Sequence, residues 1–125
     1  MMIYRTRKLI KPEDLNSRGT LFGGKVLMWI DEEAAIYAIC QLDSSQIVTK
    51  AMSEINFVST AKVGDVIEFG MDLVKIGTTS ITIACDVRNK KTKQSIIKID
   101  QIVFVLLDQT GKPKPHGKTE KTISN

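Results

Sequence analysis

The sequence has few of the residues that usually build metal sites or activated nucleophiles. Its 125 residues include one histidine and two cysteines. Cys40 and Cys85 lie far apart and form no CxxC pair, so no zinc site is indicated, and a reduced intracellular protein is the simplest interpretation. His116 lies in the basic C-terminal segment, away from any nucleophile pattern, which argues against a Ser-His-Asp triad and a histidine-bound metal. We therefore expect no metal.

Long apolar runs are also missing. No run approaches the length that crosses a membrane. The basic N-terminal residues contain no continuous apolar segment like that of a secretory signal. We therefore expect a cytoplasmic protein that does not insert into a membrane.

Length and charge describe an ordinary small protein. A chain of this length is typical of a single domain. The formal net charge is +4, but residues 111–125 alone carry four lysines against one glutamate. The charge is weak evidence for nucleic-acid binding and fits a small phosphorylated ligand as well. We expect one domain over residues 1–110, no nucleic-acid partner, and a basic tail, 111–125, that is mobile or docks on a neighbour.

The order of the elements predicts an α+β domain. Short connections between consecutive strands favour an antiparallel sheet, and the single helix must then cover one of its faces. Gly70 lies within a strand and suggests a bulge. The pattern predicts a helix from about Gly24 to Gln41 and strands over residues 3–10, 47–59, 66–76, 80–89 and 95–108.

The predicted helix is apolar nearly all round, which is typical of a helix buried on several sides. In so short a chain, some of that burial is expected to come from a second subunit. The apolar positions are Val26, Leu27, Met28, Trp29, Ile30, Ala34, Ala35, Ile36, Tyr37, Ala38 and Ile39.

One carboxylate, Asp31, interrupts this apolar helix. A carboxylate among apolar neighbours costs free energy unless it has a partner. Two interpretations therefore stay open: a structural Asp that is hydrogen-bonded or solvated at a helix edge, and an acid kept for chemistry. Its neighbours at helical spacing are Leu27, Met28, Ala34, Ala35 and Ala38.

The start of the helix favours the chemical interpretation. Gly23 and Gly24 allow another group to approach the backbone closely. The first amides of a helix have no internal partner and carry the positive end of the helix dipole, so they suit a developing oxyanion. Asn16, in the preceding loop, is a neutral donor and acceptor that can orient water or a carbonyl. The alternative for Asn16 is plain turn chemistry.

These residues form a pattern that resembles a known family. Asn16-x-x-Gly19-x-x-Phe22-Gly23-Gly24, followed by Met28-Trp29-Ile30-Asp31-Glu32-x-Ala34-Ala35, resembles the hotdog-fold acyl-CoA thioesterases. The match is best with their bacterial acyl-CoA hydrolase branch, which is similar to the mammalian cytosolic acyl-CoA hydrolases. Further matches at residues 55–65, 77–83 and 103–115 extend the resemblance over nearly the whole chain.

The resemblance implies a hotdog fold, in which a curved antiparallel sheet wraps a long central helix. It also implies a double-hotdog dimer, commonly assembled into a trimer of dimers (a hexamer), with each active site between two protomers. Asp31 would be the catalytic general base or nucleophile. Asn16, from the facing protomer, would position water or substrate, and the Gly24 amide would polarise the thioester carbonyl. Gly23 and Phe22 would contact substrate, although many relatives carry histidine where this chain has Phe22.

The substrate implied by the resemblance has two further needs. The phosphates of CoA need cations, for which Arg88, Lys90, Lys91 and Lys93 are candidates. The alternative for these residues is a solvated charged turn. The acyl chain needs an apolar slot, for which Trp29, Met28 and Met52 are weak candidates because such residues are more often core.

The expected function is hydrolysis of fatty acyl-CoA to free acid and CoA, with no cofactor besides the CoA of the substrate. A carboxylate in an apolar surrounding is a stronger base than one in water, which suits this chemistry. A non-catalytic acyl-CoA-binding hotdog protein is the alternative. A hotdog hydratase needs a histidine beside an acid, and the single histidine argues against it.

Overall fold

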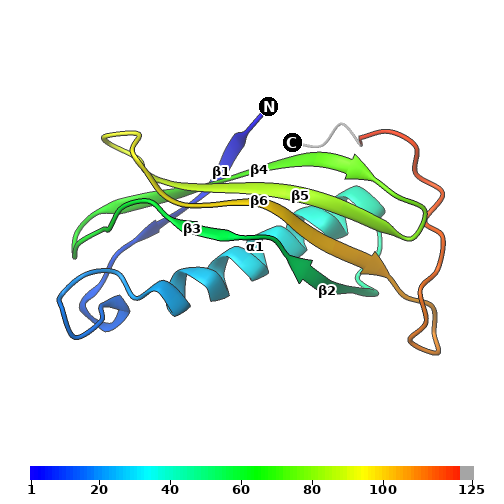
Figure 1. Ribbon diagram of the computed structural model, residues 1–125, viewed down its shortest axis with the longest axis horizontal. Coiled ribbons are helices and arrows are strands. Elements are labelled where there is room, and N and C mark those ends of the chain that lie inside the picture. Colours follow the sequence, from blue (N-terminus) through cyan, green and yellow to red (C-terminus); the bar gives the residue numbers. More distant parts are fainter. Residues whose placement is uncertain (122–125) are drawn as a thin grey trace.

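The computed structural model describes residues 1–121 of the chain. One long helix lies against one face of a curved sheet, and the helix axis runs along the sheet (Figure 1). The helix α1 spans Gly23–Leu42, and a short 3₁₀ helix, η1, spans Pro12–Asp14. The strands are β1 (Ile3–Leu9), β2 (Ile47–Met52), β3 (Ile55–Phe57), β4 (Val66–Ile76), β5 (Ser80–Asn89) and β6 (Ser95–Leu106).

The sheet is antiparallel in every pairing that the described residues make. Its strand order is β1-β4-β5-β6-β2, and β3 pairs with β6 beside β2. The short connections β4–β5 and β5–β6 make the centre of the sheet a meander, as the sequence predicted. The α+β class and the single helix covering one face of a curved sheet are both confirmed.

Helix α1 starts and ends one residue outside its predicted limits. Phe22 precedes it in an extended conformation, with φ −70° and ψ 121°. Asp43 follows it in the left-handed region, with φ 53°, a conformation that commonly ends helices and that Asp tolerates better than most residues. Phe22 and Asp43 thus mark the two ends of the helix.

The single strand predicted over residues 47–59 is wrong, because the chain forms two short strands there. The ladder with β6 is interrupted at Ser53. The Ser53 amide donates to the Gln101 carbonyl at 2.8 Å, and the Ser53 hydroxyl accepts from the Gln101 amide at 3.0 Å. The serine side chain thus takes a place that a backbone carbonyl fills in a regular ladder. This break separates β2 from β3.

The bulge predicted at Gly70 lies in the neighbouring strand instead. Gly70 pairs with both Tyr4 and Asp86, and the register shifts in β1 between Tyr4 and Thr6. A Cβ at position 70 would lie 2.6 Å from Cε2 of the Tyr4 ring. Gly70 is therefore needed to make space for an aromatic ring, not to bend its own strand.

The core lies between α1 and the concave face of the sheet. Val26, Ile30, Ala34 and Ala38 of the helix are at most 1% exposed. Other positions on the same helix stay open: Met28 is 58% exposed and Ile36 is 49% exposed. The single chain therefore buries one side of the apolar helix, and burial of the rest by a second subunit stays a prediction.

The described part of the tail, residues 111–121, bonds to the end of β6 and to the connection between β4 and β5. The Lys114 amide donates to the Leu106 carbonyl at 2.9 Å, and the His116 amide donates to the Thr78 carbonyl at 3.1 Å. The division at residue 110 and the mobility of the tail stay predictions, and residues 122–125 lie outside the described residues. Within residues 1–121, no helix is long and apolar enough to cross a membrane.

Candidate active site

Asp31 lies near the middle of α1 and is half-buried. The Thr49 hydroxyl donates a hydrogen bond of 2.7 Å to Asp31 Oδ1. The bond joins the helix to β2, an edge strand of the sheet, and it fixes the orientation of the carboxylate. A half-buried carboxylate needs a partner, and for Asp31 this partner is a threonine on a strand. It is not a loop residue, and it is not solvent alone.

The register of the sheet explains how Thr49 reaches the helix. Thr49 pairs with Phe104 of β6, which is fully buried under α1. Directly opposed residues in an antiparallel pair point to the same face, so Thr49 also faces the helix. Sequence reasoning missed Thr49. The available signal was its spacing of two from Ile47, which puts a polar residue on the core-facing side of a strand.

The first turn of α1 presents free backbone donors. Within residues 1–121, the amides of Gly23 and Gly24 donate to no backbone carbonyl, whereas those of Lys25 and Val26 both donate to the Phe22 carbonyl. No side chain caps this end of the helix. Two N–H groups at the positive end of the helix dipole are thus left for an acceptor, as expected for an oxyanion site.

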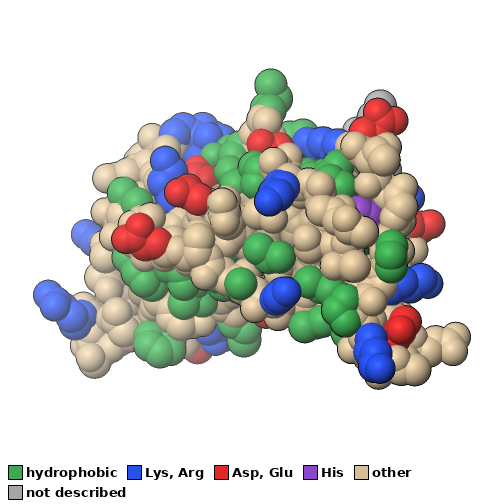
Figure 2. Space-filling view, turned by 45° about the vertical axis from the view of Figure 1, so that its right-hand side comes forward, with side chains coloured by type: hydrophobic (Ala, Val, Ile, Leu, Met, Phe, Trp, Pro, Cys, Tyr) green, Lys and Arg blue, Asp and Glu red, His purple; other side chains and the backbone are tan. Residues whose placement is uncertain are grey.

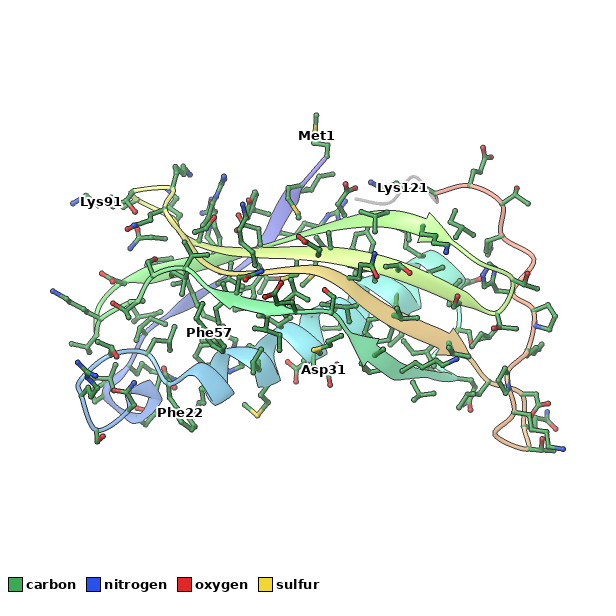
Figure 3. The ribbon with its side chains drawn as sticks, in the orientation of Figure 1. Met1, Phe22, Asp31, Phe57, Lys91 and Lys121 are labelled. Carbon is green, nitrogen blue, oxygen red and sulfur yellow. The ribbon has the colours of Figure 1, made fainter. Side chains whose placement is uncertain are left out.

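Two aromatic rings flank this first turn. A Cβ at Gly23 would lie 2.9 Å from Cε1 of Phe57, and a Cβ at Gly24 would lie 3.2 Å from Cε2 of Phe22. Both rings therefore contact the glycine backbone directly. Figure 3 shows Phe22 and Phe57 near the start of α1 and Asp31 farther along the helix. The rings are 54% and 59% exposed, respectively.

Asn16 organises the loop that leads to α1. Its Oδ1 accepts from the Arg18 amide at 2.9 Å and from the Thr20 amide at 3.2 Å, and its Nδ2 donates to the Thr20 hydroxyl at 3.1 Å. The turn role considered for Asn16 is thus present in the structure. Oδ1 carries most of these contacts.

Asp31 and the Gly24 amide lie far apart within one chain. Asp31 follows Gly24 by seven residues of the same helix, which at about 1.5 Å per residue is about 10 Å along the axis. A reacting carbonyl must lie about 3 Å from both its oxyanion donor and its attacking group. One chain alone therefore does not bring the two groups to a common substrate atom.

The cations predicted for the CoA phosphates lie away from Asp31. Arg88 is bonded within the sheet, whereas Lys90 and Lys91 are exposed in a connection between strands. The Arg88 Nε donates to Glu68 Oε1 at 2.8 Å, and the Arg88 guanidinium stacks on the Tyr4 ring with its carbon 3.5 Å from the ring centroid. Arg88 is thus already held by its own chain. Lys90 and Lys91 are exposed in the connection between β5 and β6, and Figure 3 shows Lys91 at the same end of the molecule as the start of α1.

Arg88 belongs to a polar cluster on the convex face of the sheet, made of Tyr4, Glu68, Asp86, Arg88 and Ser95. Tyr4 donates a hydrogen bond to Asp86 Oδ2, and Ser95 donates to Asp86 Oδ1 at 2.7 Å. Burial raises the pKa of Tyr4, the hydrogen bond to Asp86 adds to the effect, and the pKa reaches about 12. Burial of Glu68 also acts to raise its pKa, but hydrogen bonds from Arg88 and Lys93 outweigh it, so the pKa lies below the ordinary 4.5.

The three apolar residues considered for an acyl slot lie in different environments. Trp29 is 8% exposed and packs edge-on against Phe69, with ring centroids 6.4 Å apart, so it belongs to the core of the single chain. Met52 is half-buried and packs against the core, whereas Met28 projects from the exposed side of α1. Among residues 1–121, no group of three or more His, Cys, Asp or Glu side chains is placed to hold a metal ion.

The chain belongs to the thioesterase superfamily, whose family model matches residues 18–96. It is 35% identical to the acyl-CoA thioester hydrolase YciA of Salmonella typhimurium over 115 residues, which cover 87% of this chain and 86% of that protein. This match confirms the predicted class, thioester hydrolase, for the chain.

The fold matches solved thioesterases equally well. A hexameric thioesterase from Yersinia pestis superposes with a TM-score of 0.83 at 30% identity, covering 91% of this chain and 94% of that one. An acyl-CoA hydrolase from Staphylococcus aureus, solved with butyryl-CoA and CoA, gives a TM-score of 0.80 at 30% identity, covering 91% and 68%. The predicted resemblance to hotdog-fold thioesterases is confirmed.

Proposed function

We propose that this protein hydrolyses acyl-CoA to a free acid and CoA, at a site built from Asp31, Thr49, Asn16 and the first turn of α1. The observation that carries the site assignment is the half-buried Asp31 carboxylate, oriented by Thr49 on a helix whose first amides are free. Membership of the thioesterase superfamily supports the reaction class. The names of the relatives support acyl-CoA as the substrate.

The chemistry assigns one task to each group. Asp31 accepts a proton from a water molecule, whose oxygen attacks the thioester carbonyl carbon. The Gly24 amide donates to the carbonyl oxygen as it becomes negative, with the helix dipole behind it. The C–S bond then breaks, and the CoA thiolate leaves and takes up a proton. The Thr49 hydrogen bond keeps one carboxylate oxygen occupied, so the other is directed at the water.

Each site needs two copies of the chain. Asp31 and Gly24 of one chain are separated by about 10 Å along the helix. Two antiparallel helices side by side would bring Asp31 of one chain next to Gly24 of the partner subunit, and the reverse at a second site. The loop of Asn16 precedes Gly24 in the chain, so Asn16 of the partner subunit would accompany that amide. A twofold dimer therefore carries two equal sites.

The surface supports such a dimer. Met28 on α1 is 58% exposed, and Val48 on β2 and Val58 just after β3 are 39% and 53% exposed. Figure 2 shows hydrophobic side chains reaching the surface in the lower part of the molecule, at the height where α1, β2 and β3 lie in Figure 1. The dimer would cover these exposed apolar residues of α1, β2 and the end of β3. Hexameric relatives support a further assembly of such dimers into a trimer.

The relatives add support for two of the site residues. Solved variants of the Staphylococcus aureus hydrolase replace an asparagine and an aspartate by alanine, and the two lie fifteen positions apart. Asn16 and Asp31 have the same spacing in this chain. Lys90 and Lys91 are proposed for the CoA phosphates, because they are exposed at the end of the molecule where α1 begins. Arg88 is already bound to Glu68, so any contact that it makes with the CoA phosphates would be in addition to that hydrogen bond.

Release of free thiol from a series of acyl-CoAs, acetyl to dodecanoyl, tests the proposal. The wild-type protein should turn over part of the series, and Asp31→Asn should lose at least about a hundredfold in kcat while folding normally, because an amide accepts no proton from water. Turnover that survives in Asp31→Asn would keep the reaction and remove this site assignment. Binding of acyl-CoA without turnover by the wild type would favour the non-catalytic alternative.

A further inference from the structure

Phe57 occupies an unusual position for an aromatic residue on the inner face of a sheet. It ends β3 and pairs with Ile97, which is 1% exposed and faces α1. Opposed residues share a face, so Phe57 also faces the helix side. Nevertheless, 59% of Phe57 is exposed. A large ring on the core side of the sheet is thus left uncovered by its own chain.

The ring is placed by direct contact with the start of the helix. A Cβ at Gly23 would lie 2.9 Å from Cε1 of Phe57, a separation that real Cβ atoms essentially never show. Glycine at position 23 therefore allows the ring to lie against the first turn. Phe22 lies against Gly24 in the same way, 3.2 Å from the position of a Cβ. Both glycines of the first turn, whose amides are free, are therefore packed against an aromatic ring.

Phe57 carries no hydrogen-bonding group, and this indicates which part of a bound thioester it contacts. The CoA side of the substrate is polar, with amides and phosphates that need donors and acceptors. The acyl side is a hydrocarbon chain that gains free energy by leaving water, on the order of threefold to fourfold in affinity for each methylene buried. A bare aromatic face beside the oxyanion donors fits the first methylenes of the acyl chain.

We propose that Phe57 forms the wall of the acyl-chain site next to the reacting carbonyl and makes the protein discriminate between acyl chains of different length. This inference rests on the proposed function, because it takes the Gly24 amide as the place of the thioester carbonyl. Phe57 of one chain and Gly24 of the same chain serve the same bound thioester. Asp31 reaches that thioester from the partner subunit's helix, so Phe57 selects the substrate without taking part in proton transfer.

The test measures the binding of two CoA thioethers that cannot be hydrolysed, S-ethyl-CoA and S-hexyl-CoA, to the assembled protein by calorimetry. Phe57→Ala should weaken S-hexyl-CoA by about tenfold and S-ethyl-CoA by less than about threefold, since the ethyl group offers the ring a single carbon beyond the carbonyl position whereas the hexyl group offers several. Phe57→Leu should keep most of the preference for the longer chain. Val74→Ala, which truncates an apolar side chain that is 50% exposed on β4, is the matched control and should change neither affinity.

A second pair of variants tests the contact itself. As a single substitution, Gly23→Ala should displace the Phe57 ring and reduce the preference for S-hexyl-CoA over S-ethyl-CoA. In the Phe57→Ala background the same change should leave the preference unaltered, because no ring remains to be displaced. Light scattering shows whether each variant keeps the assembly of the wild type. Dissociation of the Phe57→Ala assembly would make the ring an interface residue and overturn the proposal.

Equal weakening of both thioethers in Phe57→Ala, or no weakening, would also overturn the inference. Because the readout is binding, it stands apart from the test of hydrolysis. A wild type that binds S-hexyl-CoA more tightly through Phe57 but releases no thiol from hexanoyl-CoA would contradict the proposed hydrolysis and leave this inference intact. If the wild type hydrolyses hexanoyl-CoA and Phe57→Ala keeps the same chain-length preference, the proposed hydrolysis stands and the role of Phe57 is contradicted. A wild type that binds neither thioether would contradict this inference.

Discussion

The Thr49 hydroxyl donates a 2.7 Å hydrogen bond to Asp31 and thereby ties the middle of α1 to the edge strand β2. A carboxylate on a largely apolar helix is held by a neutral hydroxyl, so its negative charge is oriented but not cancelled. Such an arrangement suits a base that must accept a proton.

Removal of the Thr49 hydroxyl should lower turnover without unfolding the protein. Thr49→Val keeps the shape of the side chain, and a hydrogen bond to a charged group contributes enough that kcat should fall about tenfold to a hundredfold. Thr49→Ser keeps the hydroxyl and should recover most of the activity. The measurement is kcat and KM for butyryl-CoA, together with the pH profile of kcat. Equal activity in the Val and Ser variants would show that the bond does not orient Asp31.

Asn16 has a structural and a proposed chemical role, and one substitution separates them. Asn16→Asp keeps the oxygen that accepts from the Arg18 and Thr20 amides, so the loop should keep its shape. It loses the side-chain N–H donors and adds a second carboxylate near Asp31 of the partner subunit. We expect kcat to fall at least about tenfold with little change in melting temperature. A variant with wild-type kcat would leave Asn16 with the loop role alone.

Gly70 should be essential for packing, although its backbone conformation suits other residues. In Gly70→Ala the new methyl would meet the Tyr4 ring, which is held by stacking of Arg88 and by a hydrogen bond to Asp86. Overpacking of this kind costs about 1–3 kcal/mol. Denaturant unfolding measures the change. The same substitution in a Tyr4→Ala background should cost clearly less, and an equal cost in both backgrounds would contradict the explanation.

Glu68 should make the stability of the protein depend on acid pH. Its folded pKa lies below the ordinary value of 4.5 because hydrogen bonds from Arg88 and Lys93 outweigh the effect of burial. A lowered folded pKa contributes stability that is fully present above the unfolded value and is lost as the pH falls through the folded pKa. Unfolding free energy measured from pH 7 downward should therefore drop below about pH 4.5.

Glu68→Gln provides the comparison for that titration. The variant should be less stable at pH 7, because Arg88 loses its carboxylate partner. The difference between the two proteins should shrink as the pH falls, since the wild-type carboxylate becomes protonated. A difference that stays constant down to pH 2 would show that Glu68 contributes through packing and not through its charge.

Much of this architecture was predictable from the sequence. The helix limits followed from the apolar run that starts at Gly23 and Gly24 and stops before the polar residues 43–45. The strands β4, β5 and β6 followed from their alternating apolar and polar residues and from the short polar turns between them. The break at Ser53 was not predictable, because it depends on a side chain that replaces a backbone acceptor on β6. The position of the bulge near Gly70 depends likewise on a ring from β1, which lies far away in sequence.

The candidate site was predictable in its residues but not in its connections. Asp31, Gly24 and Asn16 were visible as chemistry-bearing residues in a short segment. Thr49 was missed because its contact with Asp31 depends on the β2–β6 register. Arg88 looked like a free cation in the sequence, whereas the sheet places it against Glu68 and Tyr4. Contacts across strands are set by tertiary pairing, which local pattern does not determine.

Complementation between two inactive variants tests the shared site most directly. Chains with Asp31→Asn and chains with Gly24→Val are expected to be inactive alone, because one lacks the base and the other blocks approach to the oxyanion donors. A mixed dimer carries one site with both defects and one site with neither, since each site takes Asp31 from one chain and Gly24 from the other. Co-expression of the two chains with different tags, followed by tandem purification, isolates the mixed assembly for assay of thiol release from butyryl-CoA. Each mixed dimer should have about half of the wild-type activity. Because about half of the dimers in a randomly assembled hexamer are mixed, the purified hexamer should have about a quarter of the wild-type activity. No recovery of activity in a correctly assembled mixture would contradict a site built from two protomers.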